Sequence, residues 1–183
     1  MDKNHNPEFT MLEFYQAYTD YNFMMDFVEK MFKKVANDLD MKIISWDGHK
    51  INLSKKFARK SMDELIQEHT GESVDLSDVK AVLNLCKKLD LKVKKSDGLA
   101  KMIDAIMRKK IEPNLINPTY VINHPVEISP LAKINRDGDK NFTERFELFI
   151  VGMEFANGFS ELNDPIDQRN RFEGFFGLWA LQD

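Results

Sequence analysis

Two carboxylates near a Val-Gly dipeptide are the residues of this sequence best suited to binding a divalent cation. If the chain forms a hairpin that turns at Val151-Gly152, Phe149 pairs with Glu154, and Glu147 then shares a face of the sheet with Glu154. Carboxylates in this relation suit a hard cation such as Mg²⁺, which also binds phosphate oxygens. Two solvated carboxylates on the wet face of an antiparallel sheet fit the same pattern. The spacing alone leaves both interpretations open.

A second set of polar and aromatic residues follows directly. Asn157, Phe159 and Glu161 alternate, so in an extended chain they project from one face. An amide, a ring and a carboxylate suit an aliphatic ammonium ligand, because the ring covers methylenes and the carboxylate pairs with the charge. If Glu154 and Asn157 face one site, their different parity requires a bulge or bend near Asn157-Gly158. The alternative is that Phe159 is a core residue and Glu161 a strand-end charge.

The N-terminal part of the chain carries further candidates. Residues 8–15 are predicted to form a strand, on which Glu13 and Tyr15 share one face and could close the same pocket from the opposite side. His5 and Phe9 lie just upstream, and an imidazole near phosphates and a ring against adenine are chemically sensible roles. A histidine near a terminus is also commonly a solvated side chain. Geometry must decide between these roles.

Composition limits the class of protein. With 183 residues, of which 43% are hydrophobic, the chain can bury one sizeable core. A net charge of -4, from 26 basic and 30 acidic residues, argues against binding nucleic acid through an overall electrostatic field. One cysteine excludes an internal disulfide. No signal peptide and no apolar run of about 18 residues is present, so we expect a protein of the cytoplasm without a membrane partner.

Hydrophobic periodicity predicts the first helices and a hairpin. Apolar residues at three- and four-residue steps predict a long amphipathic helix over residues 20–39. Asp47-Gly48 predicts the tight turn of a small β-hairpin. Residues 61–112 are predicted to form three short helices, of which the first begins with a capping box made by Ser61 and Glu64. We interpret this helical stretch as an insertion between strands.

The remaining pattern returns to strands. Residues 119–122 form a compact β-type run, residues 135–140 a polar surface loop, and residues 144–155 two strands. Residues 164–172 are predicted to be helical because Pro165 suits a first helical position. The predicted fold class is therefore α+β, an antiparallel sheet flanked by helices with a small helical insertion.

Three stretches, residues 5–15, 118–133 and 145–164, resemble class II lysyl-tRNA synthetases in order and spacing. The resemblance spans residues 5–173, and the predicted helical insertion corresponds to a variable insertion of that family. It implies a partial class II catalytic domain over residues 1–183. The reaction implied is attack of the lysine carboxylate on the α-phosphorus of ATP, followed by transfer of the lysyl group to tRNA(Lys).

The resemblance also implies roles for the residues that would bind ATP. Glu147 and Glu154 would bind the Mg²⁺ ions that bridge the ATP phosphates. Phe9 would stack on adenine, and His5 would approach the phosphates. Metal and cation clamps would contribute most of the catalysis in such a site.

The same resemblance assigns the lysine pocket. Glu161 and Tyr15 would recognise the ε-ammonium group, and Asn157 would contact the region of the lysine carboxylate. Phe159 would line the aliphatic chain, and Glu13 would lie against the bound amino acid. Lysine and ATP are thus the expected ligands.

Several departures from the family pattern accompany these matches. The arginine of the second family motif, the whole of the first and third motifs and the anticodon-binding barrel are not found, and Met153 stands where the family usually has a basic residue. Residues 174–183 are foreign to the pattern, and the apolar stretch of residues 175–179 is expected to cover a surface left by the missing strands. We therefore expect no catalytic arginine in this chain, and dimerisation, which is usual in the family, is left open.

Three interpretations follow from these matches and departures. The first is a fragment of a lysine–tRNA ligase, and the second is a non-catalytic lysine- or ATP-binding paralogue or partner module. The third is a ligase that attaches lysine to a translation elongation factor, a relative with the same fold. Ser160 and Asn163 fit the tRNA ligase better than this last relative.

Overall fold

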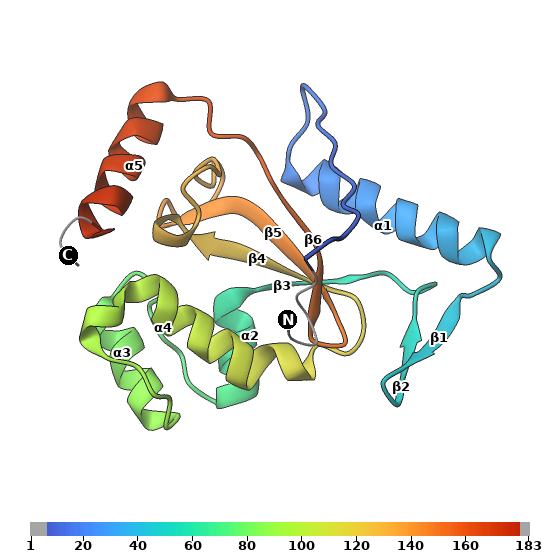
Figure 1. The fold of residues 1–183 in the computed structure, drawn as a ribbon, viewed down its shortest axis with the longest axis horizontal. Helices are drawn as coiled ribbons and strands as arrows, with labels where there is room; N and C mark the ends of the chain where they lie inside the picture. The colour runs from blue at the N-terminus through green and yellow to red at the C-terminus, as the bar shows by residue number, and fades with distance from the viewer. Residues whose placement is uncertain (1–6, 180–183) are drawn as a thin grey trace.

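A four-stranded sheet at the centre of the molecule separates one long helix from a group of shorter ones (Figure 1). The computed structural model describes residues 7–179 of the chain. The strand order is β3-β4-β5-β6. Their bounds are Ala58–Ser61 for β3, Thr119–Pro125 for β4, Phe142–Ile150 for β5 and Met153–Phe159 for β6.

The predicted α+β fold class is confirmed, and the predicted antiparallel strands have one parallel neighbour in addition. β4, β5 and β6 are antiparallel neighbours, but β3 pairs with β4 in parallel. The predicted strands omitted β3 because its sequence, Ala-Arg-Lys-Ser, has no apolar alternation. Parallel neighbours require a crossover connection, and the helical insertion between β3 and β4 provides it.

One long helix covers one face of the sheet. The helix α1 spans Tyr21–Asp38, and the side chain of Asp20 caps it by accepting a hydrogen bond from the Phe23 amide at 3.0 Å. Its buried side chains pack against Tyr120 of β4, whose hydroxyl donates to the Met25 carbonyl at 2.9 Å. The helix predicted over residues 20–39 is confirmed.

The predicted hairpin follows α1. Its strands are β1, Ile43–Trp46, and β2, His49–Asn52. Asp47 and Gly48 have φ angles of 48° and 79°, the left-handed values that a tight hairpin turn requires. The Asp47-Gly48 turn is therefore confirmed.

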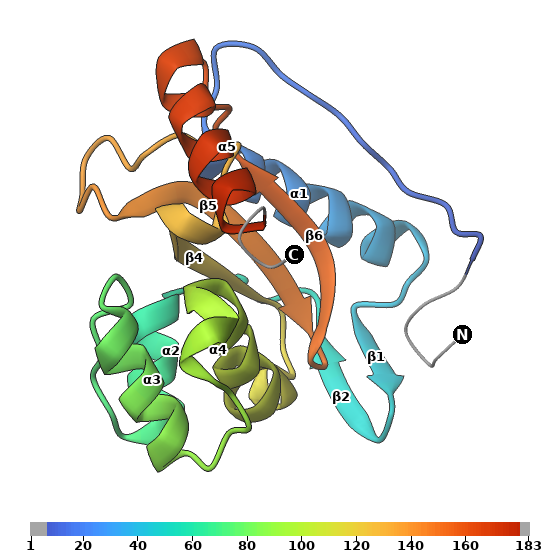
Figure 2. The same ribbon diagram turned by 60° about the vertical axis from the view of Figure 1, so that its left-hand side comes forward.

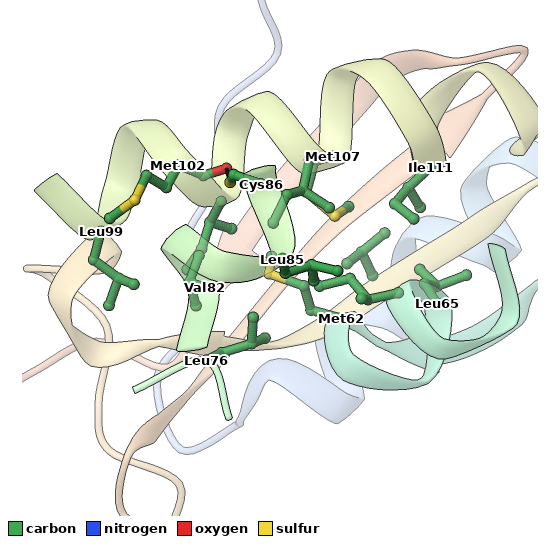
Figure 3. Packing of buried hydrophobic residues seen from close by; sticks show 14 of the residues in the cluster. Met62, Leu65, Leu76, Val82, Leu85, Cys86, Leu99, Met102, Met107 and Ile111 are labelled. Carbon is green, nitrogen blue, oxygen red and sulfur yellow. Dashed lines mark hydrogen bonds between the residues drawn. The ribbon is translucent and has the colours of Figure 1, made fainter. Parts of the chain in front are cut away.

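The helical insertion packs on the opposite face of the sheet around its own apolar core (Figure 3). Ser61 and Glu64 form the predicted capping box. Val121 and Phe149 of the sheet join this core, so the insertion rests directly on β4 and β5. The helices are α2 (Met62–Thr70), α3 (Val79–Lys88) and α4 (Gly98–Ile106), with a π-helical turn at Met107–Ile111 and 3-10 turns at Lys95–Asp97 and Glu112–Asn114.

The strand predicted over residues 8–15 is wrong. This segment is extended and largely exposed, and it pairs with no strand within residues 7–179 (Figure 2). A strand needs a neighbour to satisfy its backbone groups, and its mixed β-type composition does not supply one. The segment leads directly into α1.

The helix α5, Pro165–Trp179, closes the described chain. The Asp164 side chain accepts hydrogen bonds from the amides of Ile166 and Asp167, at 2.9 and 3.2 Å. Arg171 docks the helix by donating to the Ala132 carbonyl at 2.8 Å. The helix predicted over residues 164–172 is confirmed and continues further.

The side chains of residues 175–179, which are expected to cover a surface left by missing strands, lie outside the described part of the chain. Among the described helices, none combines the length and apolar character needed to cross a membrane.

Candidate active site

The β5–β6 hairpin turns where the sequence predicts. Phe149 pairs with Glu154, but Leu148 pairs with Ala156, so Phe155 is an extra residue in β6. This β-bulge restores the parity of the residues that follow it. The bulge predicted near Asn157-Gly158 therefore exists, but it lies earlier, between Glu154 and Ala156.

The bulge brings the candidate residues of both strands onto one face of the sheet. Glu147 lies directly opposite Asn157, and Arg145 lies opposite Phe159. Glu154 lies diagonally from Glu147, as the predicted register requires. Opposite and diagonal side chains on one face of a sheet are within reach of each other and of one ligand.

Glu147 has a strongly perturbed carboxyl group. Burial raises its pKa to about 7, and the negative charges of Glu154 and Glu112 act in the same direction. The positive charge of Arg145 opposes them, because its Nη2 donates to Glu147 Oε1 at 2.6 Å. Because nearby carboxylates make ionisation of such a group unfavourable, a bound cation would stabilise its ionised form.

The chemistry of these donors fits Mg²⁺ together with a phosphate ligand. Within residues 7–179, no group of three or more acidic, histidine or cysteine side chains is arranged to bind a metal ion. Glu147 and Glu154 supply carboxylate oxygens on a shared face. Mg²⁺ is commonly bound by one or two carboxylates plus substrate phosphates, so this pair suits Mg²⁺ carried by a nucleotide.

Arg145 is a residue of the site that the sequence analysis missed. Besides Glu147, it donates from Nε to Asn157 Oδ1 at 3.3 Å and from Nη1 to the Ile128 carbonyl at 2.8 Å and Ser129 Oγ at 3.2 Å. Its alternation with Glu147 along β5 was the available signal. Arginine offers five donors in a fixed plane, which suits such a multiple contact.

The end of β6 is tied to the start of α1. The Ser160 amide donates to the Glu144 carbonyl at 2.9 Å, and Ser160 Oγ accepts from the Tyr21 amide at 3.0 Å. Glu161 forms an isolated β-bridge with Ala132. These contacts fix the backbone at Ser160 and Glu161, directly after β6.

An ion pair between half-exposed Arg136 and buried Glu144 supports the same corner. Arg136 donates from Nε and Nη2 to the two carboxylate oxygens of Glu144 at 2.6 and 2.7 Å. Burial raises the pKa of Glu144, but hydrogen bonds from Arg136 and Ser160 outweigh it and leave the pKa below its usual value. The sequence placed Arg136 in a polar surface loop and gave no signal for this pair.

An exposed acidic group lies just beyond the end of β6. It consists of Glu161 and, from the N-terminal segment, Glu13 and Tyr15. The Tyr15 hydroxyl donates to Glu13 Oε1 at 2.5 Å. This hydrogen bond raises the pKa of Tyr15, followed by the charge of Glu13 and, more weakly, that of Glu161. Two carboxylates and a phenol in electrostatic contact are suited to an organic cation.

The residues expected to contact adenine and the phosphates are not brought to this group. Phe9 is 74% exposed and makes no ring contact within the described residues. His5 lies outside the described residues. Phe159, the last residue of β6, is half-buried on the shared face.

Comparisons with known proteins identify the family of the chain. The chain is similar to lysine–tRNA ligases of Carboxydothermus hydrogenoformans (49% identical over 172 residues, 92% of this chain and 35% of the relative), Leuconostoc mesenteroides (48% over 178 residues, 94% and 35%) and Xanthomonas campestris (46% over 172 residues, 92% and 34%). It thus spans about a third of the length of these relatives. The family "tRNA synthetases class II (D, K and N)" matches residues 1–175, and the chain therefore belongs to the class II tRNA synthetases.

Proposed function

We propose that this chain provides lysine- and ATP-binding residues of a lysine–tRNA ligase. The observation that carries the proposal is the shared face of β5 and β6, where Glu147 and Glu154 lie beside Asn157 and Phe159. The carboxylate of lysine attacks the α-phosphorus of ATP, which forms lysyl-adenylate and releases pyrophosphate. The lysyl group is then transferred to the 3′ end of tRNA(Lys).

Lysine binding is supported by the acidic group of Glu13, Tyr15 and Glu161. The ε-ammonium of lysine pairs with Glu161 and receives further contacts from Tyr15 and Glu13. Phe159 lines the methylenes of the ligand, and the amide of Asn157 binds its carboxylate. The spacing along alternate positions matches an extended amino acid with opposite charges at its two ends.

ATP binding is supported by the two carboxylates of the hairpin. Glu147 and Glu154 hold Mg²⁺ that carries the phosphates, and the bound cation supplies charge neutralisation at the phosphate oxygens. Ionisation of Glu147 is needed for this role, and its pKa of about 7 makes it sensitive to pH near neutrality. Phe9 and His5 complete the proposal as contacts to adenine and to the phosphates.

The remaining parts of the proposal concern the surroundings of the protein. The similarity to lysine–tRNA ligases supports tRNA(Lys) as the acceptor. The cytoplasm as the location and a homodimer as the assembly follow from the family resemblance alone. These features belong to the whole enzyme, of which the chain spans about a third in its relatives.

Calorimetry with L-lysine and L-norleucine tests the lysine pocket. L-norleucine has the same carbon chain without the ε-ammonium group, so it should bind much more weakly than L-lysine. Glu161→Gln should lower the affinity for L-lysine at least tenfold, because it removes a charge-assisted contact. Glu72→Gln, in the helical insertion, is the matched control and should bind as the unaltered chain does. Equal binding of both amino acids would refute the proposed pocket.

Lysine-dependent exchange of labelled pyrophosphate into ATP tests the chemistry. Exchange that requires L-lysine and Mg²⁺ is the expected result for a ligase. Lysine binding without exchange would instead favour the second candidate, a binding module derived from the enzyme.

A further inference from the structure

We propose that Arg145 is a positioning residue that fixes Glu147 and Asn157 relative to each other and so couples the cation side of the site to the amino-acid side. This inference rests on the proposed function, because it assigns Glu147 to the cation and Asn157 to the amino acid. The guanidinium contacts Glu147 Oε1 at 2.6 Å and Asn157 Oδ1 at 3.3 Å. These two residues lie directly opposite each other on β5 and β6.

The Arg145 guanidinium is itself held by residues 128 and 129. Its Nη1 donates to the Ile128 carbonyl at 2.8 Å and to Ser129 Oγ at 3.2 Å, and Ser129 is buried. The Arg145 side chain is 17% exposed. A planar guanidinium that is held on one side by two acceptors has little freedom on the other side, so its contacts fix Glu147 and Asn157 relative to each other.

The contact with Asn157 selects what its amide offers to a ligand. Since Oδ1 accepts from Arg145, the Nδ2 group is the end of the amide that remains for other partners. Nδ2 is a donor, and the carboxylate of an amino acid needs donors. Arg145 therefore sets the polarity of the amide to suit a carboxylate rather than an ammonium group.

The contact with Glu147 fixes the direction of that carboxylate. Arg145 Nη2 donates to Glu147 Oε1 at 2.6 Å, which leaves Oε2 for a cation. Both side chains are largely buried, at 17% and 18% exposed, so the pair has few other orientations.

Two substitutions separate the charge of Arg145 from its geometry. Arg145→Gln removes the charge and most of the donors. Arg145→Lys keeps a charge that can reach Glu147, but a single ammonium group cannot also hold Asn157 and the Ile128 carbonyl in one plane. Arg171→Gln is the matched control, because Arg171 donates to the Ser129 and Ala132 carbonyls of the same loop without a contact to Glu147.

Nuclear magnetic resonance of the chain without ligand gives the first readout. The side-chain amide signal of Asn157 should shift in both variants, because each loses the planar donor to Oδ1. At fixed pH, the side-chain carboxyl carbon of Glu147 should shift in Arg145→Gln and less in Arg145→Lys, which keeps a donor that can reach it. Arg171→Gln should change neither signal. A folded Arg145→Gln protein with both signals unchanged would overturn the proposal.

Binding gives the second readout. Titration with MgCl₂ should show about tenfold weaker affinity in Arg145→Gln, because Glu147 is no longer held in one orientation, and a smaller loss in Arg145→Lys, which keeps a donor to Glu147. L-lysine affinity should fall about tenfold in both Arg145 variants. Equal losses of affinity in Arg145→Gln and Arg171→Gln would indicate a merely structural role and overturn the proposal. If the unaltered chain binds neither ligand, the proposed function fails, while the resonance shifts still decide whether Arg145 positions the two residues.

Discussion

Strand β5 carries two carboxylates, Glu144 and Glu147, whose environments differ in a way that separates support from function. Glu144 is 1% exposed and is paired with Arg136 through two hydrogen bonds, at 2.6 and 2.7 Å. Its pKa lies below the usual value. Glu147 has one hydrogen bond from Arg145 and faces other carboxylates, and its pKa is raised to about 7.

The difference shows which carboxylate is already satisfied by the protein. The folded protein supplies Glu144 with the cation and the donors that its ionised form needs, so this residue stabilises the fold. It supplies Glu147 with too little positive charge, so ionisation of Glu147 costs stability. A group left in that condition on the shared face of β5 and β6 is a candidate for ligand binding. The following experiments test this contrast, beginning with the largest effect.

Removal of the cation beside Glu144 should have the largest effect. Arg136→Gln leaves the Glu144 carboxylate buried without its partner, and we expect a loss of about 3 kcal/mol in the free energy of unfolding at pH 7.5. Urea denaturation measures it. Lys34→Gln, which removes the cation of the exposed pair with Asp38, is the control and should change stability by less than about 0.5 kcal/mol. Similar small losses in both variants would show that Glu144 is not supported in this way.

Removal of the charge of Glu147 should act in the opposite direction. Because its pKa is raised in the folded state, its contribution to stability is complete below the ordinary glutamate value of 4.5 and is lost as the pH rises through about 7. Glu147→Gln has no ionisable group at this position, so the variant does not lose this stability as the pH rises. We expect the variant to be more stable than the unaltered chain by about 2 kcal/mol at pH 8 and equally stable at pH 4.

The pH dependence of the difference is the decisive measurement for Glu147. Unfolding of both proteins in urea should be compared at several values between pH 4 and pH 8. Other groups titrate in both proteins and cancel, including Glu144, whose lowered pKa removes stability only as the pH falls through it. A variant that is less stable than the unaltered chain at pH 8 would contradict the contrast between the two residues.

An added cation should supply the positive charge that the protein does not provide beside Glu147. If MgCl₂ binds at Glu147 and Glu154, saturation several-fold above its dissociation constant should stabilise the chain by about 1 kcal/mol at pH 8. Glu147→Gln should remove this effect, and Glu144, already paired, should be indifferent to the salt. Thermal unfolding with MgCl₂ and with NaCl of equal ionic strength distinguishes binding from screening. Equal stabilisation by both salts would exclude a specific site.

The regular elements were predictable because each is encoded locally. The apolar stripe of α1, the Asp47-Gly48 turn and the capping box at Ser61 each specify their structure within a few residues. Strand β3 was not predictable, because its pairing with β4 depends on a partner about 60 residues away and its own sequence has no apolar alternation. The absence of a partner for residues 8–15 is a non-local property of the same kind.

The site was predictable in its residue types but not in its support. Alternation placed Glu147, Glu154, Asn157 and Phe159 on one face once a bulge was allowed, and the structure brings them together. The contacts of Arg145 with Ile128 and of Arg136 with Glu144 join separate segments through side chains. Such contacts leave no periodic trace in a sequence, although the alternation of Arg145 with Glu147 was visible.

Tyr15 should show the smallest effect on stability and a clear one on binding. Its side chain is 75% exposed, and its hydroxyl donates only to the exposed Glu13. Tyr15→Phe should leave the melting temperature unchanged, because no buried group loses a partner. If the hydroxyl contributes to recognition of the ε-ammonium, L-lysine affinity should fall severalfold in calorimetry, while Tyr18→Phe, at a fully exposed position, should leave it unchanged. A change in melting temperature without a change in affinity would place Tyr15 with Glu144, among the residues that support the fold.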